Sequence, residues 1–334
     1  MEMKKLKFIS LALLFALFST VHSSAQEKVL KFNDNHKFKI VQLTDIHWVY
    51  GNPNSDIAGT RINEILDAEK PDLVVVTGDL IFAKPAAEGI KAALEPMVKR
   101  NIPFAVTFGN HDDEQGLSRK ELLDIISQLP GNLTTTTEGI SGTTNYILPI
   151  MSSNGEKQAA TLYVFDSNTY STSKSIKGYG WIEYDQIDWY LRRSAEFTKS
   201  NNNTPLPSLA FFHIPIPEYH EAASNEGAFI VGTRKERACA PEINTGLGAA
   251  MLKSGDVMGV FVGHDHINDY AADWRGILLC YGRYSGGNTV YNNVPNGNGA
   301  RIIELTEDSR NFKTWIRIKD NQMLNMVSYP EDTK

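Results

Sequence analysis

Aspartate, asparagine and histidine side chains follow five short apolar runs of this sequence. The clearest run, from Val74 to Asp79, has β-branched residues that indicate a strand buried on both faces. Such a strand places the Asp79 carboxylate at the carboxyl edge of a sheet, where open α/β sheets bind their ligands. The other four runs end in Asp45-Ile46-His47, Gly109-Asn110-His111-Asp112, His213 and Gly263-His264-Asp265-His266.

The side chains at these strand ends offer oxygen and imidazole-nitrogen donors and no sulfur, a set that suits borderline divalent metals such as Mn, Fe or Zn. One strand-end aspartate more often caps the next helix. Five of the eight histidines of the chain fall in these stretches, however, which favours a shared site. Two ions about 4 Å apart can hold both the attacking and the leaving oxygen of a phosphoryl transfer. The expected metal ligands are Asp45, His47, Asp79, Asn110, His213, His264 and His266.

The composition is that of a globular protein with an acidic balance. The chain has 334 residues, of which 42% are hydrophobic and 22% charged, and a formal net charge of -6. An acidic chain without a basic cluster is a poor match for a nucleic acid polymer, whose binding requires many Lys and Arg contacts to phosphates. A small phosphorylated substrate remains compatible, because bound metal ions supply positive charge locally.

Residues 1–25 have the pattern of a secretory signal peptide, with Lys4, Lys5 and Lys7 before an apolar stretch and Ser23-Ser24-Ala25 as a small-residue cleavage site. The stretch is too short for a membrane span, which needs about 20 apolar residues. We therefore expect residues 26–334 to form a single domain, periplasmic or secreted, with no transmembrane segment. An oxidising compartment permits a Cys239–Cys280 disulfide, although Cys280 in its apolar run also fits a buried free thiol.

The order of predicted elements indicates an α/β fold. Helices are predicted near residues 61–68, at 86–100 and from Ser118, which forms a capping box with Glu121. These helices alternate with the first strands, which favours a parallel sheet covered by helices. Asn154-Gly155 predicts a hairpin that begins a second, more antiparallel sheet. Later helices are expected at 184–198 and 246–252, a loop at 215–241, and strands of that second sheet at 267–272, 276–281, 301–305 and 314–318.

In this order, the five strand-end motifs resemble those of the calcineurin-like metallophosphoesterases. The segments 67–75, Gly178-Tyr-Gly-Trp181 and Phe211-Phe-His-Ile-Pro215 are similar to the compact purple-acid-phosphatase-like branch of that family. The resemblance covers about residues 37–315. It implies a four-layer αββα sandwich, with two mixed β-sheets flanked by helices and the site where the sheets meet.

The resemblance also implies roles for single residues. It assigns one metal to Asp45, His47 and His266, the other to Asn110, His213 and His264, and the bridge between them to Asp79. His111 then faces the substrate and protonates the leaving oxygen, while Asp112 either holds His111 or is a turn residue. Arg283 is a candidate for substrate contact, with Arg234, Arg237 and Tyr179 as weaker candidates.

One departure separates this chain from true purple acid phosphatases. They carry a tyrosine three residues after the aspartate of Gly-Asp, where this chain has Phe82, and they lack the histidine present here as His47. The first metal therefore loses a phenolate and gains an imidazole. A ferric-tyrosinate chromophore is not expected.

These observations predict a secreted phosphoesterase with two divalent ions, in which a metal-bridging hydroxide attacks phosphorus in line. Phosphomonoesters are the favoured substrates. A diester would need an apolar or aromatic wall, which Trp48, Tyr50, Tyr179 and Trp181 could supply. The alternatives are a phosphodiesterase or nucleotide pyrophosphatase, and a metal-binding regulatory protein without turnover.

Overall fold

Two mixed β-sheets form the centre of the computed structural model, which describes residues 29–225 and 227–333. In the first sheet, of order β13-β12-β11-β1-β2-β3, three parallel neighbours are β1 (Lys37–Leu43), β2 (Leu73–Thr77) and β3 (Phe104–Thr107). Its antiparallel strands are β11 (Gly299–Thr306), β12 (Phe312–Ile318) and β13 (Met323–Tyr329). The predicted signal peptide, residues 1–25, lies outside the described residues.

The second sheet has the order β4-β5-β6-β8-β10-β9-β7. Its parallel strands are β5 (Gln158–Val164), β6 (Ser208–Phe211), β8 (Val257–Val262) and β10 (Ile277–Tyr281). Antiparallel strands flank them: β4 (Tyr146–Met151), β9 (Ala271–Trp274) and β7 (Ile230–Val231). The β4–β5 hairpin confirms the turn predicted at Asn154-Gly155.

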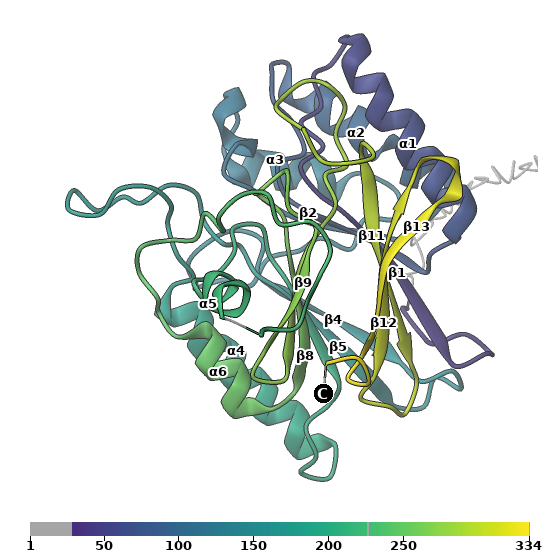
Figure 1. Cartoon of the computed structure of the whole chain (residues 1–334), viewed down its shortest axis with the longest axis vertical. Helices are drawn as coiled ribbons and strands as arrows, with labels where there is room; N and C mark the ends of the chain where they lie inside the picture. Colours follow the sequence, from purple (N-terminus) through teal and green to yellow (C-terminus); the bar gives the residue numbers. More distant parts are fainter. Residues whose placement is uncertain (1–28, 226, 334) are drawn as a thin grey trace, which may run out of the picture.

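Helices cover the outer face of each sheet. The first sheet carries α1 (Pro53–Glu69), α2 (Ala86–Arg100) and α3 (Arg119–Ser127), and the second carries α4 (Tyr184–Ser200), α5 (Glu218–Ser224) and α6 (Leu247–Ser254). Short 3-10 helices lie at Asp112–Gln115 and Lys319–Asn321. The capping box predicted between Ser118 and Glu121 is present at the start of α3. Figure 1 shows α4 and α6 on one flank of the strands and α1 on the other.

The molecule has three hydrophobic cores, and successive residues of one strand point into different cores. Ile40 and Val75 of the first sheet pack with Leu162 of the second, between the sheets. Their neighbours Val41 and Val74 instead pack under the helices of the first sheet. Because each buried Val or Ile side chain contributes about 1.5–3 kcal/mol, this alternation fixes the order of the layers. The predicted four-layer αββα sandwich is confirmed.

Several element predictions were wrong. The segments 301–305 and 314–318 form strands, but in the first sheet, because β11 pairs antiparallel with β1, as in Ile303 opposite Ile40. The strand predicted at 267–272 begins only at Ala271, since Asn268 closes a turn onto the carbonyl of Asp265. The loop predicted at 215–241 contains α5. β13 was not predicted.

Among the described residues, none of the helices has the length and apolar character needed to cross a membrane.

Candidate metal centre

The carboxyl ends of five parallel strands, drawn from both sheets, meet at one crevice. The residues that follow these strands were all predicted as metal ligands, and all are buried: Asp45 and His47 after β1, Asp79 after β2, Asn110 after β3, His213 after β6, and His264 and His266 after β8. The chain thus brings its seven predicted donors to the edge where the two sheets face each other.

Tight turns direct these side chains into the crevice. Asp45, His47, Asp79 and His264 have backbone φ angles of 53°, 46°, 52° and 79°, in the left-handed region that non-glycine residues rarely adopt. The turns also approach one another closely. A Cβ atom on Gly109 would lie 2.1 Å from the Asp79 Oδ1 atom, so only glycine fits at that position.

The first donor set consists of Asp45, His47 and His266. The Nε2 atoms of His47 and His266 lie 3.0 Å apart, and His266 Nε2 lies 3.6 Å from Asp45 Oδ1. His266 donates from Nδ1 to the carbonyl of Tyr291 over 2.8 Å, which leaves its Nε2 lone pair facing the crevice. Burial lowers the pKa of His47 to about 3, so this ring is neutral. A divalent cation beside both Nε2 atoms would accept both lone pairs.

The second donor set consists of Asn110, His213 and His264. The buried Asn110 Oδ1 and His213 Nε2 atoms make no hydrogen bond within the described residues. His213 Nδ1 lies 2.7 Å from the Thr77 carbonyl, and Asn110 Nδ2 donates over 3.1 Å to the Tyr170 hydroxyl. These bonds turn the unpaired atoms toward the crevice. Buried polar atoms without a partner are costly unless a cation binds them, so the donor set fits a metal ion.

Asp79 lies between the two sets. Its Oδ2 atom is 3.5 Å from His47 Nε2 and 3.3 Å from His213 Nε2, whereas Oδ1 accepts the backbone N–H of His111 over 2.9 Å. Burial opposes ionisation of Asp79, but the charge of His213 outweighs it and holds the Asp79 pKa well below its usual value. Burial likewise opposes protonation of His213, and the Asp79 charge outweighs it, raising the His213 pKa to about 9.

Asp45, a member of the first set, also binds the backbone of His264 in the second set. Each of its carboxylate oxygens lies 3.1 Å from the backbone N–H of His264, and Oδ2 accepts the Thr44 hydroxyl over 2.8 Å. Burial raises the pKa of Asp45, and the same effect lowers the pKa of the His264 imidazole well below its usual value. The turn that carries His264 is therefore fixed by a residue of the first set.

His111 is held by a residue that the sequence did not single out. Its ring is about a third exposed, at 31%, and its Nδ1 lies 2.7 Å from Glu114 Oε2. Glu114 Oε1 also accepts the Tyr170 hydroxyl over 3.2 Å. Glu114 lies three residues after His111 in the 3-10 helix, a spacing that could have indicated this pair.

Of the two roles predicted for Asp112, the contacts fit that of a turn residue. It is buried, and its carboxylate accepts backbone N–H groups of Asp79 at 3.0 Å, Leu80 at 2.7 Å and Gly109 at 2.8 Å. Among the described residues it forms no hydrogen bond or ion pair with the His111 side chain, so it ties the β2 and β3 loops together rather than orienting the ring. Burial, with the Asp79 charge, raises the Asp112 pKa to about 7.

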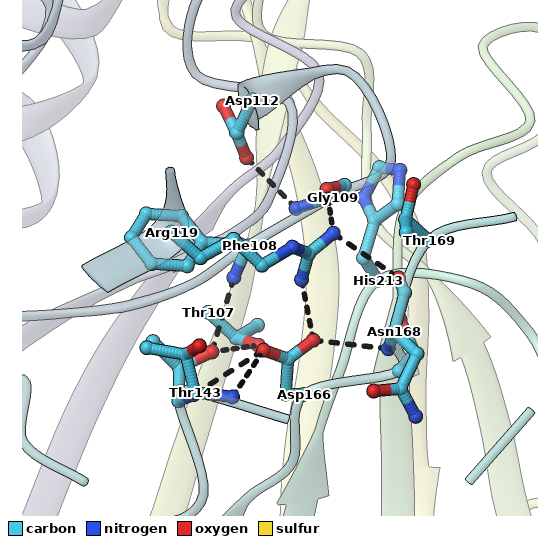
Figure 2. A network of polar contacts seen from close by, with 12 residues as sticks. Thr107, Phe108, Gly109, Asp112, Arg119, Thr143, Asp166, Asn168, Thr169 and His213 are labelled. Carbon is cyan, nitrogen blue, oxygen red and sulfur yellow. Dashed lines mark hydrogen bonds and ion pairs between the residues drawn. The ribbon is translucent and has the colours of Figure 1, made fainter. Parts of the chain in front are cut away.

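A buried ion pair holds the loop that carries Asn110. Figure 2 shows Arg119 between the carbonyl of Gly109 and the carboxylate of Asp166. The Arg119 distances are 2.6 Å to the Gly109 carbonyl and 2.5 Å to Asp166. Asp166 also accepts the backbone N–H of Thr143 over 2.7 Å. The first residue of α3 is thus fixed directly to the turn that carries Asn110.

The prediction that Arg283 contacts substrate does not fit the structure. Its side chain is 1% exposed and forms an ion pair with the buried Asp269. Its remaining donors bind the carbonyls of Pro295 and Gly297. The sequence could not show this, because the position of Arg283 just after β10 does not reveal which way its side chain points. Arg283 is a structural residue that anchors the loop after β10.

The structure also places the two cysteines, Arg234 and the aromatic residues considered in the sequence. Cys280 is buried and Cys239 exposed, and both are free thiols, so the disulfide is absent. Arg234 donates to the carbonyl of Ala223, at the end of α5. Of the aromatic residues considered for a cleft wall, Tyr179 packs edge-on against His264 at 4.3 Å between ring centroids, whereas the partly buried Trp48 packs against the core under the helices of the first sheet.

A cavity of about 310 Å³ opens beside the first donor set. It is lined by His47, Phe82, His111, His266, Thr289, Val290 and Tyr291. The segment 289–291 had no signal in the sequence, because it reaches the site from the loop between β10 and β11.

The fold and this crevice are those of a metal-dependent phosphoesterase. A family model described as calcineurin-like phosphoesterase matches residues 38–268, and the chain belongs to this family. The resemblance seen in the strand-end motifs is therefore confirmed.

Similar proteins carry both active and inactive names. "Probable inactive purple acid phosphatase 29" of Arabidopsis thaliana is 32% identical, covering 95% of this chain and 90% of its own length. "Phosphatase DCR2" of Saccharomyces cerevisiae is 36% identical, covering 86% of this chain and 55% of its own length. Among solved structures, a dimetal phosphatase from Danio rerio has a TM-score of 0.61 at 13% identity, covering 87% of this chain and 98% of its own. That likeness supports the fold.

Proposed function

We propose that this protein is a hydrolase of phosphate esters that uses two divalent ions, of Mn, Fe or Zn. The observation that carries the proposal is the position of Asp79 Oδ2, 3.5 Å from His47 Nε2 in one donor set and 3.3 Å from His213 Nε2 in the other. A carboxylate between two clusters of buried imidazole and amide donors is the arrangement that holds a pair of ions.

Two ions bound there would neutralise charge on the phosphoryl oxygens and lower the pKa of a water molecule. The chain supplies the rest. Asp79 and Asp45 fix the relative position of the two donor sets, and the turns at Gly109 and Gly263 admit the close approach. His111, with Nδ1 on Glu114, directs its other nitrogen away from that pair and protonates the leaving oxygen.

The proposal does not choose between phosphomonoesters and other phosphate esters. The sequence favoured phosphomonoesters, partly because Arg283 could bind a dianion. That ground is lost with the burial of Arg283, so the proposal covers phosphate esters as a class. The signal peptide predicted at residues 1–25 supports a periplasmic or secreted location for the activity.

A metal-binding protein without turnover is the second candidate, and the names of the Arabidopsis relatives, which call them probable inactive phosphatases, favour it. The donor set argues against it here. All seven predicted donors are buried at the crevice, four of them, Asp45, His47, Asp79 and His266, have ligand atoms within 4.8 Å of one another, and His111 lines the cavity beside them.

The test is to strip the purified protein with a chelator, reload it with Mn²⁺, Fe²⁺ or Zn²⁺, and measure metal content and hydrolysis of aryl phosphates. We expect about two ions per chain, with activity that follows loading. Active protein with fewer than one ion per chain would reject the two-metal proposal. Full loading without turnover of any monoester or diester would favour the binding protein.

A further inference from the structure

Two exposed aromatic rings line the cavity beside the first donor set. The Phe82 and Tyr291 side chains are 37% and 55% exposed, although large hydrophobic side chains are usually buried. Both line the cavity of about 310 Å³ that also contains His111. Exposed apolar surface next to reactive groups indicates a binding wall.

Both rings pack directly against histidines of the site. Phe82 packs edge-on against His47, at 5.2 Å between centroids, and against His111, at 5.5 Å. Tyr291 stacks on His266, at 4.3 Å with an interplanar angle of 19°. A planar group between these rings would therefore lie within reach of both the first metal position and His111.

The charges around the cavity favour a substrate with one negative charge. A phosphomonoester dianion presents three terminal oxygens and benefits from cationic donors beyond the metals. The residues that line the cavity include no lysine or arginine, and His111 is their one nitrogen donor outside the metal set. Arg283, the cation expected to fill this role, is paired with Asp269. A diester needs less charge and adds an organic group.

We propose, on the basis of the hydrolase function above, that the substrate is a phosphodiester with a planar aromatic substituent that binds between Phe82 and Tyr291. In the reaction, the oxygen of water forms a new bond to phosphorus and the bond from phosphorus to one ester oxygen breaks. That ester oxygen takes a proton. The products are an alcohol or phenol and a phosphomonoester.

The experiment uses metal-reloaded protein and two substrates that share one leaving group. Methyl p-nitrophenyl phosphate is a diester and p-nitrophenyl phosphate a monoester. We expect kcat/KM to be at least about tenfold higher for the diester, since the cavity offers few partners for a dianion.

A second measurement locates the planar group. Methyl phenyl phosphate and dimethyl phosphate are compared as competitive inhibitors of the same reaction. The phenyl compound should bind about tenfold more tightly, because aromatic contacts add to apolar burial. In Phe82→Leu and Tyr291→Leu this ratio should fall toward one, with metal content unchanged. Tyr184→Leu is the control, because Tyr184 is an equally aromatic side chain, 70% exposed on α4.

The outcomes separate this inference from the function on which it rests. Metal-dependent hydrolysis with a monoester preference, or with a ratio of inhibition constants near one, would overturn the inference and leave the function standing. A ratio that survives both leucine substitutions would place the planar group elsewhere and overturn the assignment. Absence of metal-dependent hydrolysis with both esters would overturn the function itself.

Discussion

The two donor sets of the metal centre differ in their surroundings. The first set faces the cavity, where His47 and His266 form part of the wall. The second set lies behind two stacked tyrosines, since Tyr179 packs on His264 and Tyr170 stacks on Tyr179 at 5.7 Å. Neither Asn110 nor His213 lines the cavity.

The support of the two sets differs as well. In the second set, the Thr77 carbonyl fixes His213 and the Tyr170 hydroxyl fixes Asn110. In the first set, the Tyr291 carbonyl fixes His266, but the buried Nδ1 atom of His47 has no hydrogen-bond partner among the described residues. Because outer-sphere hydrogen bonds strengthen metal binding, we expect the second set to retain its ion longer and the first to meet the substrate.

The largest effect should come from removing what the two sets share. Asp79→Asn weakens the link between both donor sets, so it should reduce metal content at both and lower the rate more than Asp45→Asn does. Asp45→Asn should empty the first set before the second. Elemental analysis together with kcat on an aryl phosphate checks this order. Equal metal loss in the two variants would mean that the sets are not distinct.

The second largest effect should come from replacing His111, the proposed general acid at the cavity. His111→Ala should keep both ions and lose about 10²–10⁴-fold in rate on esters with poor leaving groups, with a smaller loss for p-nitrophenolate, which needs little protonation. The measurement is kcat across a series of leaving groups. A loss that is equal across the series would assign His111 to phosphoryl positioning instead.

Glu114→Gln tests how His111 is oriented. It should show the same dependence on the leaving group at a smaller size, about 10–100-fold, because the ring loses the carboxylate on its Nδ1. Glu114→Asp should recover part of the rate if a carboxylate is what matters. Glu121→Gln, in the capping box of α3, is the matched control. A uniform loss that the aspartate does not recover would indicate a structural role.

The smallest effect concerns metal-free protein. The Asp79 charge raises the His213 pKa from 6.5 to about 9, so stability from this proton is complete below pH 6.5 and is lost as pH rises through 9. Asp112, with its pKa raised to about 7, contributes no further change above that pH. The Tm of chelator-treated protein should therefore fall between pH 7 and 9, and less so in His213→Asn or after metal loading. A flat profile would contradict this coupling.

Much of the site followed from one rule of chain geometry. Parallel strands bring their carboxyl ends to one edge, so residues as far apart as Asp45 and His266 could be placed together from apolar runs alone. The helices with strong caps or a clear apolar period, such as α2 and α3, were placed for similarly local reasons.

What sequence could not supply depended on contacts between distant residues. The Glu114–Tyr170 bond joins the β3 loop to a segment 56 residues away. Nothing local indicates that Arg283 finds a buried partner in Asp269, or that β11 pairs with β1 rather than with the second sheet. β13 has mostly half-exposed or exposed side chains, so its apolar signal is weak.

The left-handed turns at Asp45, His47, Asp79 and His264 have a consequence for how the family diverges. Each such turn in a non-glycine residue costs about 1–2 kcal/mol that glycine would not incur. In a descendant that no longer bound metal, glycine at these four turns would remove that backbone cost. This chain has side chains larger than glycine at all four turns. Glycine at these turns in a relative would therefore be a sign of lost metal chemistry that can be found without any assay.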